Sequence, residues 1–201
     1  MPDYLGHLPR EDPLHYYLER EILPQLGYAG GSADFRVFRL GERNAVYLYE
    51  ECGSGLRVAG KFFAGAYQPG TVASHRAMDR EYENLNLLRG YGLVGYPHHV
   101  VRPLGRNDGL GSLLVEEYSA DPRLSGFLDA AIGRGEHAAL FAKLTALAYF
   151  LVTLHNRTVG GIPVNFGEDC RYLDELVQEL RWQRILSEDE TQELAWLGDC
   201  W

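Results

Sequence analysis

The sequence predicts an α+β fold, in which a five-stranded antiparallel sheet with helices precedes an all-helical region. Two observations predict it. Up to residue 118 the chain shows a helix, three strands, a second helix and two further strands, and consecutive strands pair most simply as an antiparallel sheet. After residue 118 only helical patterns follow. We therefore expect two domains, residues 1–118 and residues 119–201.

The first half of the expected sheet follows a short helix. Asp12 and Pro13 are a good N-cap and first-turn pair, and apolar residues follow at helical spacing until Pro24. The segment DFRVFRLGERNAVYLYEECGSGLRVAGKFFAG, residues 34–65, is rich in β-branched and aromatic residues. The turn sequences LGERN and CGSG interrupt it, so it predicts three strands.

A second helix and two more strands complete the expected sheet. Residues 73–92 carry an apolar stripe at helical spacing, and Gly90 suits the C-terminal cap. Residues 100–105 and 112–118 are predicted strands around the turn sequence RNDG. Further helices are expected at residues 137–156 and 168–186, and after the capping sequence SEDE at 187–190.

The composition indicates a cytoplasmic, soluble protein. A formal charge of −9 argues against nucleic-acid binding, which needs a basic face. No secretory signal precedes the first helix, and the longest apolar region is interrupted by Lys143, so we expect no membrane span. Cys52, Cys170 and Cys200 lie far apart and suit reduced thiols, and the spacing of the histidines predicts no metal site.

One lysine follows a sequence that is typical of phosphate loops. Residues 55–61, GLRVAGK, contain Gly-x-x-x-x-Gly-Lys, but Phe62 stands where such a loop needs Ser or Thr to ligate magnesium. The chain after Lys61 also lacks the helical periodicity that should follow a phosphate loop. We therefore expect RVAGKFF, residues 57–63, to be a strand that carries Lys61.

With VAGK on its third strand, this plan resembles the nucleotide-binding lobe of the protein-kinase-like fold, most closely the aminoglycoside phosphotransferase and choline-kinase-like family. The resemblance implies ATP or GTP with Mg as cofactor. It also implies that Lys61 contacts phosphates and pairs with a glutamate on the next helix. Glu81, in an Arg-Glu pair, is the preferred partner. Glu83 is the alternative, since it lies about 200° round the helix and only one of the two can face the sheet.

The loop LGERNAV, residues 40–46, falls where this family's nucleotide loop joins the first two strands. It departs from the glycine-rich pattern of protein kinases. Gly41 can supply the turn geometry, and Asn44 can supply a polar contact to phosphate. An ordinary hairpin turn is the alternative interpretation.

The segment SLLVEEYSADP resembles the hinge that holds the nucleotide base through backbone groups. The resemblance assigns this role to the Glu116 C=O and the Tyr118 N–H. Val115 would lie behind the base, with Val46 and Ala59 above it. We expect the side chain of Glu116 to be an ordinary surface charge.

The family's catalytic His-Gly-Asp sequence and its later magnesium-binding Asp do not occur between Leu154 and Trp201. We therefore expect no catalytic residue and no metal ligand within this chain. The last 32 residues resemble the helical insertion that precedes the catalytic loop. The chain is thus expected to be the N-terminal, truncated part of a kinase that phosphorylates a hydroxyl of an aminoglycoside-like or other small polar acceptor.

Two alternatives remain open. A non-catalytic, kinase-like interaction module would use the helical surface near Trp196 and Trp201 for a partner or for self-association. In an unrelated α+β protein, Lys61 and Glu81 would not meet.

Overall fold

The structure is a computed structural model of the chain, and it describes residues 3–40, 45–65, 68–96, 98–120, 124–160, 171–183 and 187–188. The chain forms two compact units, Met1–Thr158 and Val159–Trp201. The first unit contains the sheet and most of the described helices. The predicted domain boundary at residue 118 stays a prediction.

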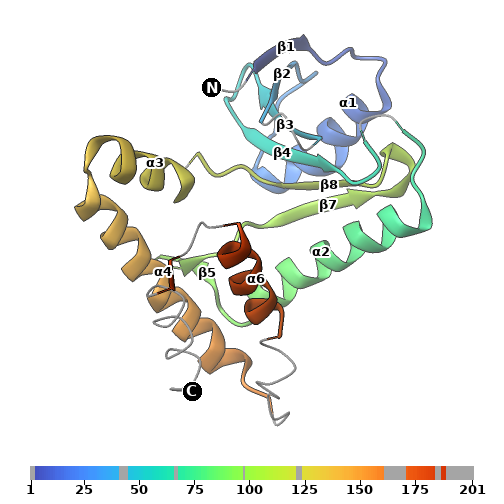
Figure 1. Ribbon diagram of the computed structural model, residues 1–201. Coiled ribbons are helices and arrows are strands. Elements are labelled where there is room, and N and C mark those ends of the chain that lie inside the picture. The colour runs from blue at the N-terminus through green and yellow to red at the C-terminus, as the bar shows by residue number, and fades with distance from the viewer. Residues whose placement is uncertain are drawn as a thin grey trace. The chain divides into compact units, whose positions relative to one another are not determined.

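A six-stranded antiparallel sheet organises the first unit (Figure 1). Its strands are β1 (Asp3–His7), β2 (Phe35–Arg39), β3 (Val46–Glu51), β4 (Arg57–Phe62), β7 (Pro103–Asn107) and β8 (Leu113–Glu117). Their order across the sheet is β1-β2-β3-β4-β8-β7. The α+β class and the antiparallel sheet are confirmed, and the five predicted strands correspond to β2, β3, β4, β7 and β8.

The sixth strand, β1, is an addition to the prediction. It pairs with β2 from Asp3 opposite Arg39 to His7 opposite Arg36, and the register shifts near Gly6, which has a positive φ of 122°. Its residues are mostly exposed, so the sequence lacks the alternation of apolar and polar residues that marks a half-buried strand. A second, two-stranded sheet joins β5 (Val94–Gly95) to β6 (His98–His99).

The predicted N-terminal helix consists of three helical segments: α1 (Pro13–Tyr17), the π-helical turn η1 (Leu18–Ile22) and the 3₁₀ turn η2 (Leu23–Leu26). Asp12 caps α1, because its carboxylate accepts a hydrogen bond of 2.8 Å from the Leu14 N–H. At the end of η1 the Leu23 N–H donates to the Leu18 C=O, five residues back. The chain then tightens through Pro24, which has no N–H to donate.

These segments cover one face of the sheet and form the core with it. Leu14, Leu18, Ile22 and Leu23 are fully buried in this core. The sheet contributes alternate residues, which are Phe35, Tyr49, Val58, Phe62, Leu113 and Val115. Because side chains alternate between the two faces of a strand, the residues between these point to the opposite face.

The helix α2 (Val72–Gly90) contributes to that opposite face and follows β7 and β8 (Figure 1). Thr71 and Ser74 form a capping box at its start. Ser74 Oγ lies 2.9 Å from Ser112 Oγ, and Arg106 on β7 donates to Asp79 on α2 at 2.7 Å. These bonds fix the rotation of α2, and therefore decide which of its side chains reach the sheet.

The helices α3 (Leu124–Arg134) and α4 (His137–Thr158) pack against each other, and the Lys143 ammonium lies 5.3 Å from the centre of the Phe127 ring. Among the parts of the chain that the structure describes, α4 is the one helix long and apolar enough to cross a membrane. The core helix of a soluble protein meets the same criterion, so length and composition alone are weak evidence.

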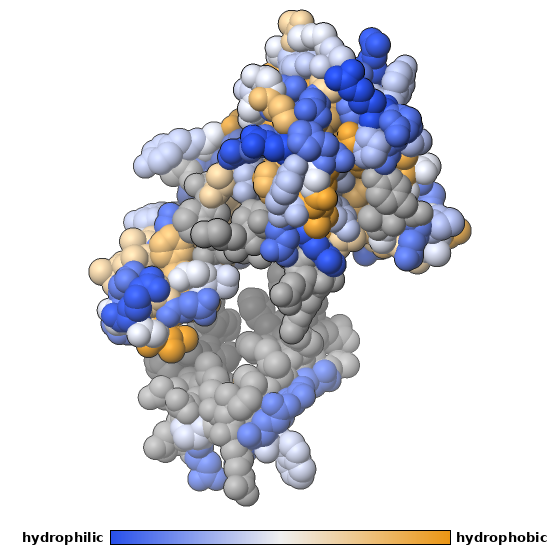
Figure 2. Space-filling model, turned by 90° about the horizontal axis from the view of Figure 1, so that it is seen from above, coloured by the Kyte–Doolittle hydropathy of each residue, from blue (hydrophilic) through white to orange (hydrophobic). Residues whose placement is uncertain are grey.

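No residue of α4 is buried, and several of its large apolar side chains are exposed. These are Phe141, Leu144, Leu147, Tyr149, Leu151 and Val152. On the face of the molecule seen in Figure 2, hydrophobic residues lie in small groups among hydrophilic ones.

In the second unit, the helix α6 (Arg171–Trp182) lies within the range predicted to be helical.

Candidate functional site

Lys61 and Glu81 form an ion pair between the sheet and α2. Lys61 lies on β4, and its Nζ is 2.7 Å from Oε1 and 2.5 Å from Oε2 of Glu81. About a third of each side chain is exposed, at 35% for Lys61 and 34% for Glu81. Glu83 instead lies 3.8 Å from Arg106. The prediction that Glu81, rather than Glu83, pairs with Lys61 is confirmed.

An aromatic ring supports Lys61 as well. The ammonium lies 4.8 Å from the centre of the Phe63 ring, two residues further along the chain. A cation over a ring face is attracted by its quadrupole. The adjacent aromatic residues of RVAGKFF were the sequence signal that could have indicated this contact.

Strand register decides which residues share a face with Lys61. Lys61 pairs with Val46 on β3 and with Leu114 on β8, while Ala59 pairs with Leu48 and with Glu116. Directly paired residues lie on the same face, and so do residues two apart on one strand. Val46, Ala59 and Glu116 therefore lie on the Lys61 face, and Val46 and Ala59 are half-buried there.

Val115 lies on the other face. It pairs with Gly60, its neighbour Leu114 pairs with Lys61, and its fully buried side chain belongs to the core under the N-terminal helical segments. The resemblance placed Val115 behind a bound base, but its side chain points away from Lys61. Leu114, which is also fully buried, takes the corresponding position on the Lys61 face.

Glu116 is more than the surface charge that we expected. Its side chain is half-buried, and among the residues that the structure describes its Oε1 is the buried side-chain oxygen or nitrogen with no hydrogen-bond partner. Burial, and then the negative charge of Glu81, raise the pKa of the Glu116 carboxyl, and Lys61 lowers it by less. Lys61, Glu81 and Glu116, which we call the Lys61 centre, thus interact electrostatically.

The other predicted contacts are placed in part. Glu116 lies inside the β4–β8 ladder, and Tyr118 lies one residue beyond the end of β8, where it is half-buried. Gly41 and Asn44, the predicted phosphate contacts, lie outside the described residues. The roles of these four residues toward a nucleotide stay predictions.

A second group of charges shares the face of Lys61. Glu50 on β3 pairs in register with Arg36 on β2 and Arg57 on β4. The two guanidinium groups bind different oxygens of its carboxylate, with a distance of 2.6 Å from Arg57 Nε. Burial raises the pKa of Glu50, but the hydrogen bonds and charges of Arg57 and Arg36 together lower it below the ordinary value. We call these three residues the Glu50 centre.

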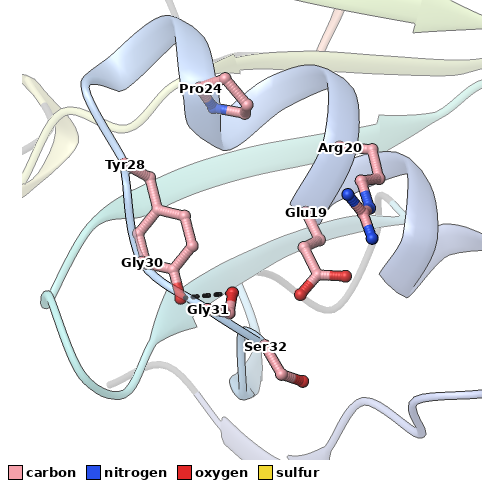
Figure 3. A pocket seen from close by; sticks show the side chains of 7 residues that line it. All are labelled: Glu19, Arg20, Pro24, Tyr28, Gly30, Gly31 and Ser32. Carbon is pink, nitrogen blue, oxygen red and sulfur yellow. Dashed lines mark hydrogen bonds between the residues drawn. The ribbon is translucent and has the colours of Figure 1, made fainter.

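The structure also has a pocket of about 540 Å³, but it lies beside the N-terminal helical segments. Figure 3 shows the side chains that line it, and Lys61 is not among them. Glu19 is already engaged, because its Oε1 accepts a hydrogen bond of 2.8 Å from the Ala33 N–H. The Tyr28 hydroxyl donates to the Gly31 C=O at 3.4 Å. These groups hold the glycine-rich loop, so we assign the pocket no chemistry.

One set of side chains within the described residues could hold a metal ion. His7, Asp34 and Cys52 offer ligand atoms that all lie within 4.8 Å of one another. This set differs from the expectation of no metal site, which was based on the spacing of the histidines and cysteines along the chain.

Comparison of the chain with protein-family models, with curated proteins and with solved structures found no match. The function must therefore be argued from the geometry of the described residues.

Proposed function

We propose that this chain binds ATP or GTP on the sheet face that carries Lys61, as the nucleotide-binding part of a small-molecule kinase. The observation that supports this most is the Lys61–Glu81 ion pair. It joins the third of the five predicted strands to the helix that follows, as the resemblance to the aminoglycoside phosphotransferase and choline-kinase-like family implies.

The pair suits phosphate binding for a chemical reason. A lysine ammonium has three N–H donors, and the two short contacts to Glu81 leave one for a phosphate oxygen. The carboxylate holds the Lys61 ammonium in position, so little reorganisation is needed when a phosphate arrives. The remaining exposure of Lys61 gives the phosphate access.

The same face carries aliphatic side chains that could contact the base. Val46 and Ala59 are half-buried beside Lys61, and Leu114 lies next to Lys61 on the neighbouring strand β8. Partly exposed aliphatic side chains next to a fixed charge are typical of nucleotide sites, where a few polar groups orient a ligand and apolar groups bury it. Main-chain groups of Glu116 and Tyr118 would hold the edge of the base.

Nucleotide binding is proposed for this chain, whereas phosphoryl transfer needs further catalytic groups. The sequence has no His-Gly-Asp, and phosphoryl transfer requires a carboxylate that orients the acceptor hydroxyl. Magnesium, when bound, would neutralise the charge on the phosphates. The groups that would ligate it, together with the acceptor site, belong in this proposal to residues beyond those of this chain.

The test is calorimetric titration of the chain with MgATP and MgGTP. Lys61→Ala should weaken binding by about 10–100-fold, since a charge-assisted hydrogen bond contributes roughly 1.5–3 kcal/mol. Lys143→Ala is the matched control, because Lys143 lies on α4 over Phe127 and should leave affinity unchanged. Equal binding by the parent and Lys61→Ala, or no binding to the folded parent, would contradict the proposal.

A second candidate is a non-catalytic interaction module, and one observation favours it. The large apolar side chains of α4, such as Phe141 and Tyr149, are about two-thirds exposed, at 64% and 65%. Exposed apolar side chains gathered on one helix are typical of contact surfaces. Sedimentation analysis of the chain with and without nucleotide separates the candidates, because a module would associate while failing to bind nucleotide.

A further inference from the structure

Potential metal ligands lie together at the ends of three neighbouring strands, at the opposite end of β3 from the residue that pairs with Lys61. His7 is the last residue of β1, Asp34 precedes β2 and Cys52 follows β3. His7 pairs with Arg36, and Arg36 pairs with Glu50, so these three residues share one face of the sheet. Asp34 is two residues from Arg36 and Cys52 is two residues from Glu50, so both lie on that face as well. The convergence is therefore a product of the fold.

The distances between the three side chains are close to those of a metal site. The His7 Nδ1 lies 2.8 Å from the Asp34 Oδ1, and the ligand atoms of His7, Asp34 and Cys52 all lie within 4.8 Å of one another. Ligand atoms around tetrahedral zinc are about 3.3–3.8 Å apart, given metal–ligand bonds of roughly 2.0–2.3 Å. Small rotations of these side chains would reach that spacing.

We propose that His7, Asp34 and Cys52 bind a divalent transition-metal ion, in the first place Zn²⁺. An imidazole, a thiolate and a carboxylate are ligands that zinc takes together, whereas magnesium and calcium prefer oxygen alone. Two anionic ligands balance the charge of the ion. His7 and Asp34 are each 49% exposed, which leaves the fourth position to water.

The main chain around the ligands is already held. The Cys52 N–H donates to the Asp34 C=O at 2.8 Å, and the Leu8 N–H donates to the Phe35 C=O at 3.0 Å. The Glu51 carboxylate accepts hydrogen bonds from the Ser54 N–H at 2.6 Å and from the Asp34 N–H at 3.4 Å. Binding the ion would therefore order side chains and leave the backbone unchanged.

Two other interpretations of the same residues make different predictions. If the cluster is only the hydrogen bond between His7 and Asp34, the chain binds no zinc through Cys52. If Cys52 is only an exposed free thiol, His7→Ala and Asp34→Ala leave metal binding unchanged. Zinc ligation is the one of the three interpretations that uses all three side chains.

The experiment titrates the chain with Zn²⁺ by calorimetry and with Co²⁺ by absorption spectroscopy. The parent carries Cys170→Ser and Cys200→Ser, so that Cys52 is its only thiol. We expect one equivalent of zinc and a thiolate-to-cobalt charge-transfer band. Cys52→Ser should abolish this band. His7→Ala and Asp34→Ala should each weaken zinc binding at least about tenfold, since losing even an outer partner of a ligand costs roughly 10–100-fold.

His99→Ala is the control, because His99 is also half-exposed and hydrogen-bonded to a carboxylate, that of Glu117. It should bind zinc as the parent does. Zinc binding that survives Cys52→Ser and His7→Ala unchanged, or no binding of one equivalent by the parent, would overturn the proposal. Because the cobalt spectrum is read on the parent, misfolding of one variant leaves the test valid, and nucleotide binding does not enter it.

Discussion

Two groups of charged side chains share one face of the sheet and differ in how their carboxylates are paired. In the Glu50 centre, two guanidinium groups bind the two oxygens of one buried carboxylate. In the Lys61 centre, one ammonium interacts with two carboxylates, and the Glu116 Oε1 has no hydrogen-bond partner within the described part of the chain. Buried polar groups are normally satisfied, and exceptions gather at functional sites. The comparison indicates that the Glu50 centre stabilises the sheet, whereas the Lys61 centre is available to a ligand.

The largest expected effect is on stability, at Glu50. Glu50→Ala removes two charge-assisted contacts from a side chain that is only 9% exposed. We expect the free energy of unfolding to fall by about 2 kcal/mol, since hydrogen bonds to charged groups contribute roughly 1.5–3 kcal/mol and the freed arginines regain water. Urea denaturation measures this. Glu117→Ala, at an exposed pair with His99, should cost less than about 0.5 kcal/mol. Equal losses of stability in Glu50→Ala and Glu117→Ala would show that the Glu50 centre does not stabilise the sheet more than an exposed ion pair does.

Substitution of Glu81 should affect nucleotide affinity more than stability. Because its pair with Lys61 is about one-third exposed, Glu81→Gln should lower the free energy of unfolding by less than about 1 kcal/mol. The affinity for MgATP should fall by about 3–10-fold, as Lys61 loses the charge that positions it. Calorimetric titration of Glu81→Gln with MgATP measures this, and Glu83→Gln is the control. A Glu83→Gln variant that weakens nucleotide binding as much as Glu81→Gln would argue against the assignment.

The smallest effect is expected at Glu116, and it depends on pH. The raised pKa means that the folded state binds this proton more tightly than the unfolded state, so the stability from Glu116 is present below the ordinary value of 4.5 and is lost as pH rises through the raised value. Glu116→Gln cannot ionise. Relative to the parent, it should therefore be more stable at pH 8 than at pH 4, by less than about 1 kcal/mol.

The two centres should respond to pH with opposite signs. The lowered pKa of Glu50 makes its contribution present above the ordinary value of 4.5 and lost as pH falls through the lowered value. Thermal melts of Glu50→Gln and Glu116→Gln across pH 3–8 measure both contributions. If the two variants shift stability in the same direction with pH, the pairing described for one of the carboxylates is wrong.

Local patterns predicted most of the sheet, the family resemblance predicted one ion pair, and strand register decided which face each side chain occupies. The strands β2, β3, β4, β7 and β8 follow from runs of β-branched and aromatic residues, whereas the pairing of Glu81 with Lys61 follows from the resemblance to a kinase family. Which face each side chain occupies depends on strand register, and a slip of one residue exchanges the faces. This is why Val115 and the side chain of Glu116 were misplaced.

Contacts between distant residues could not be predicted from a single sequence. His7, Asp34 and Cys52 meet only because β1 pairs with β2, and β1 lacks the alternating pattern that would reveal it. Phe63 was visible as a strand residue, but its contact with the Lys61 ammonium depends on a side-chain rotamer. The nature of the N-terminal helical segments, with a π turn beside a 3₁₀ turn, is likewise set by packing rather than by periodicity.

The pairing of β1 has a consequence for how the protein avoids aggregation. Without Asp3–His7, β2 would be an outer strand of the sheet and would expose the unpaired backbone groups of Phe35–Arg39. Such an edge is a template for the strands of other chains. The positive charges of Arg36 and Arg39 would then be the protection left to the segment FRVFR, so β1 acts as a built-in cover against intermolecular β-pairing.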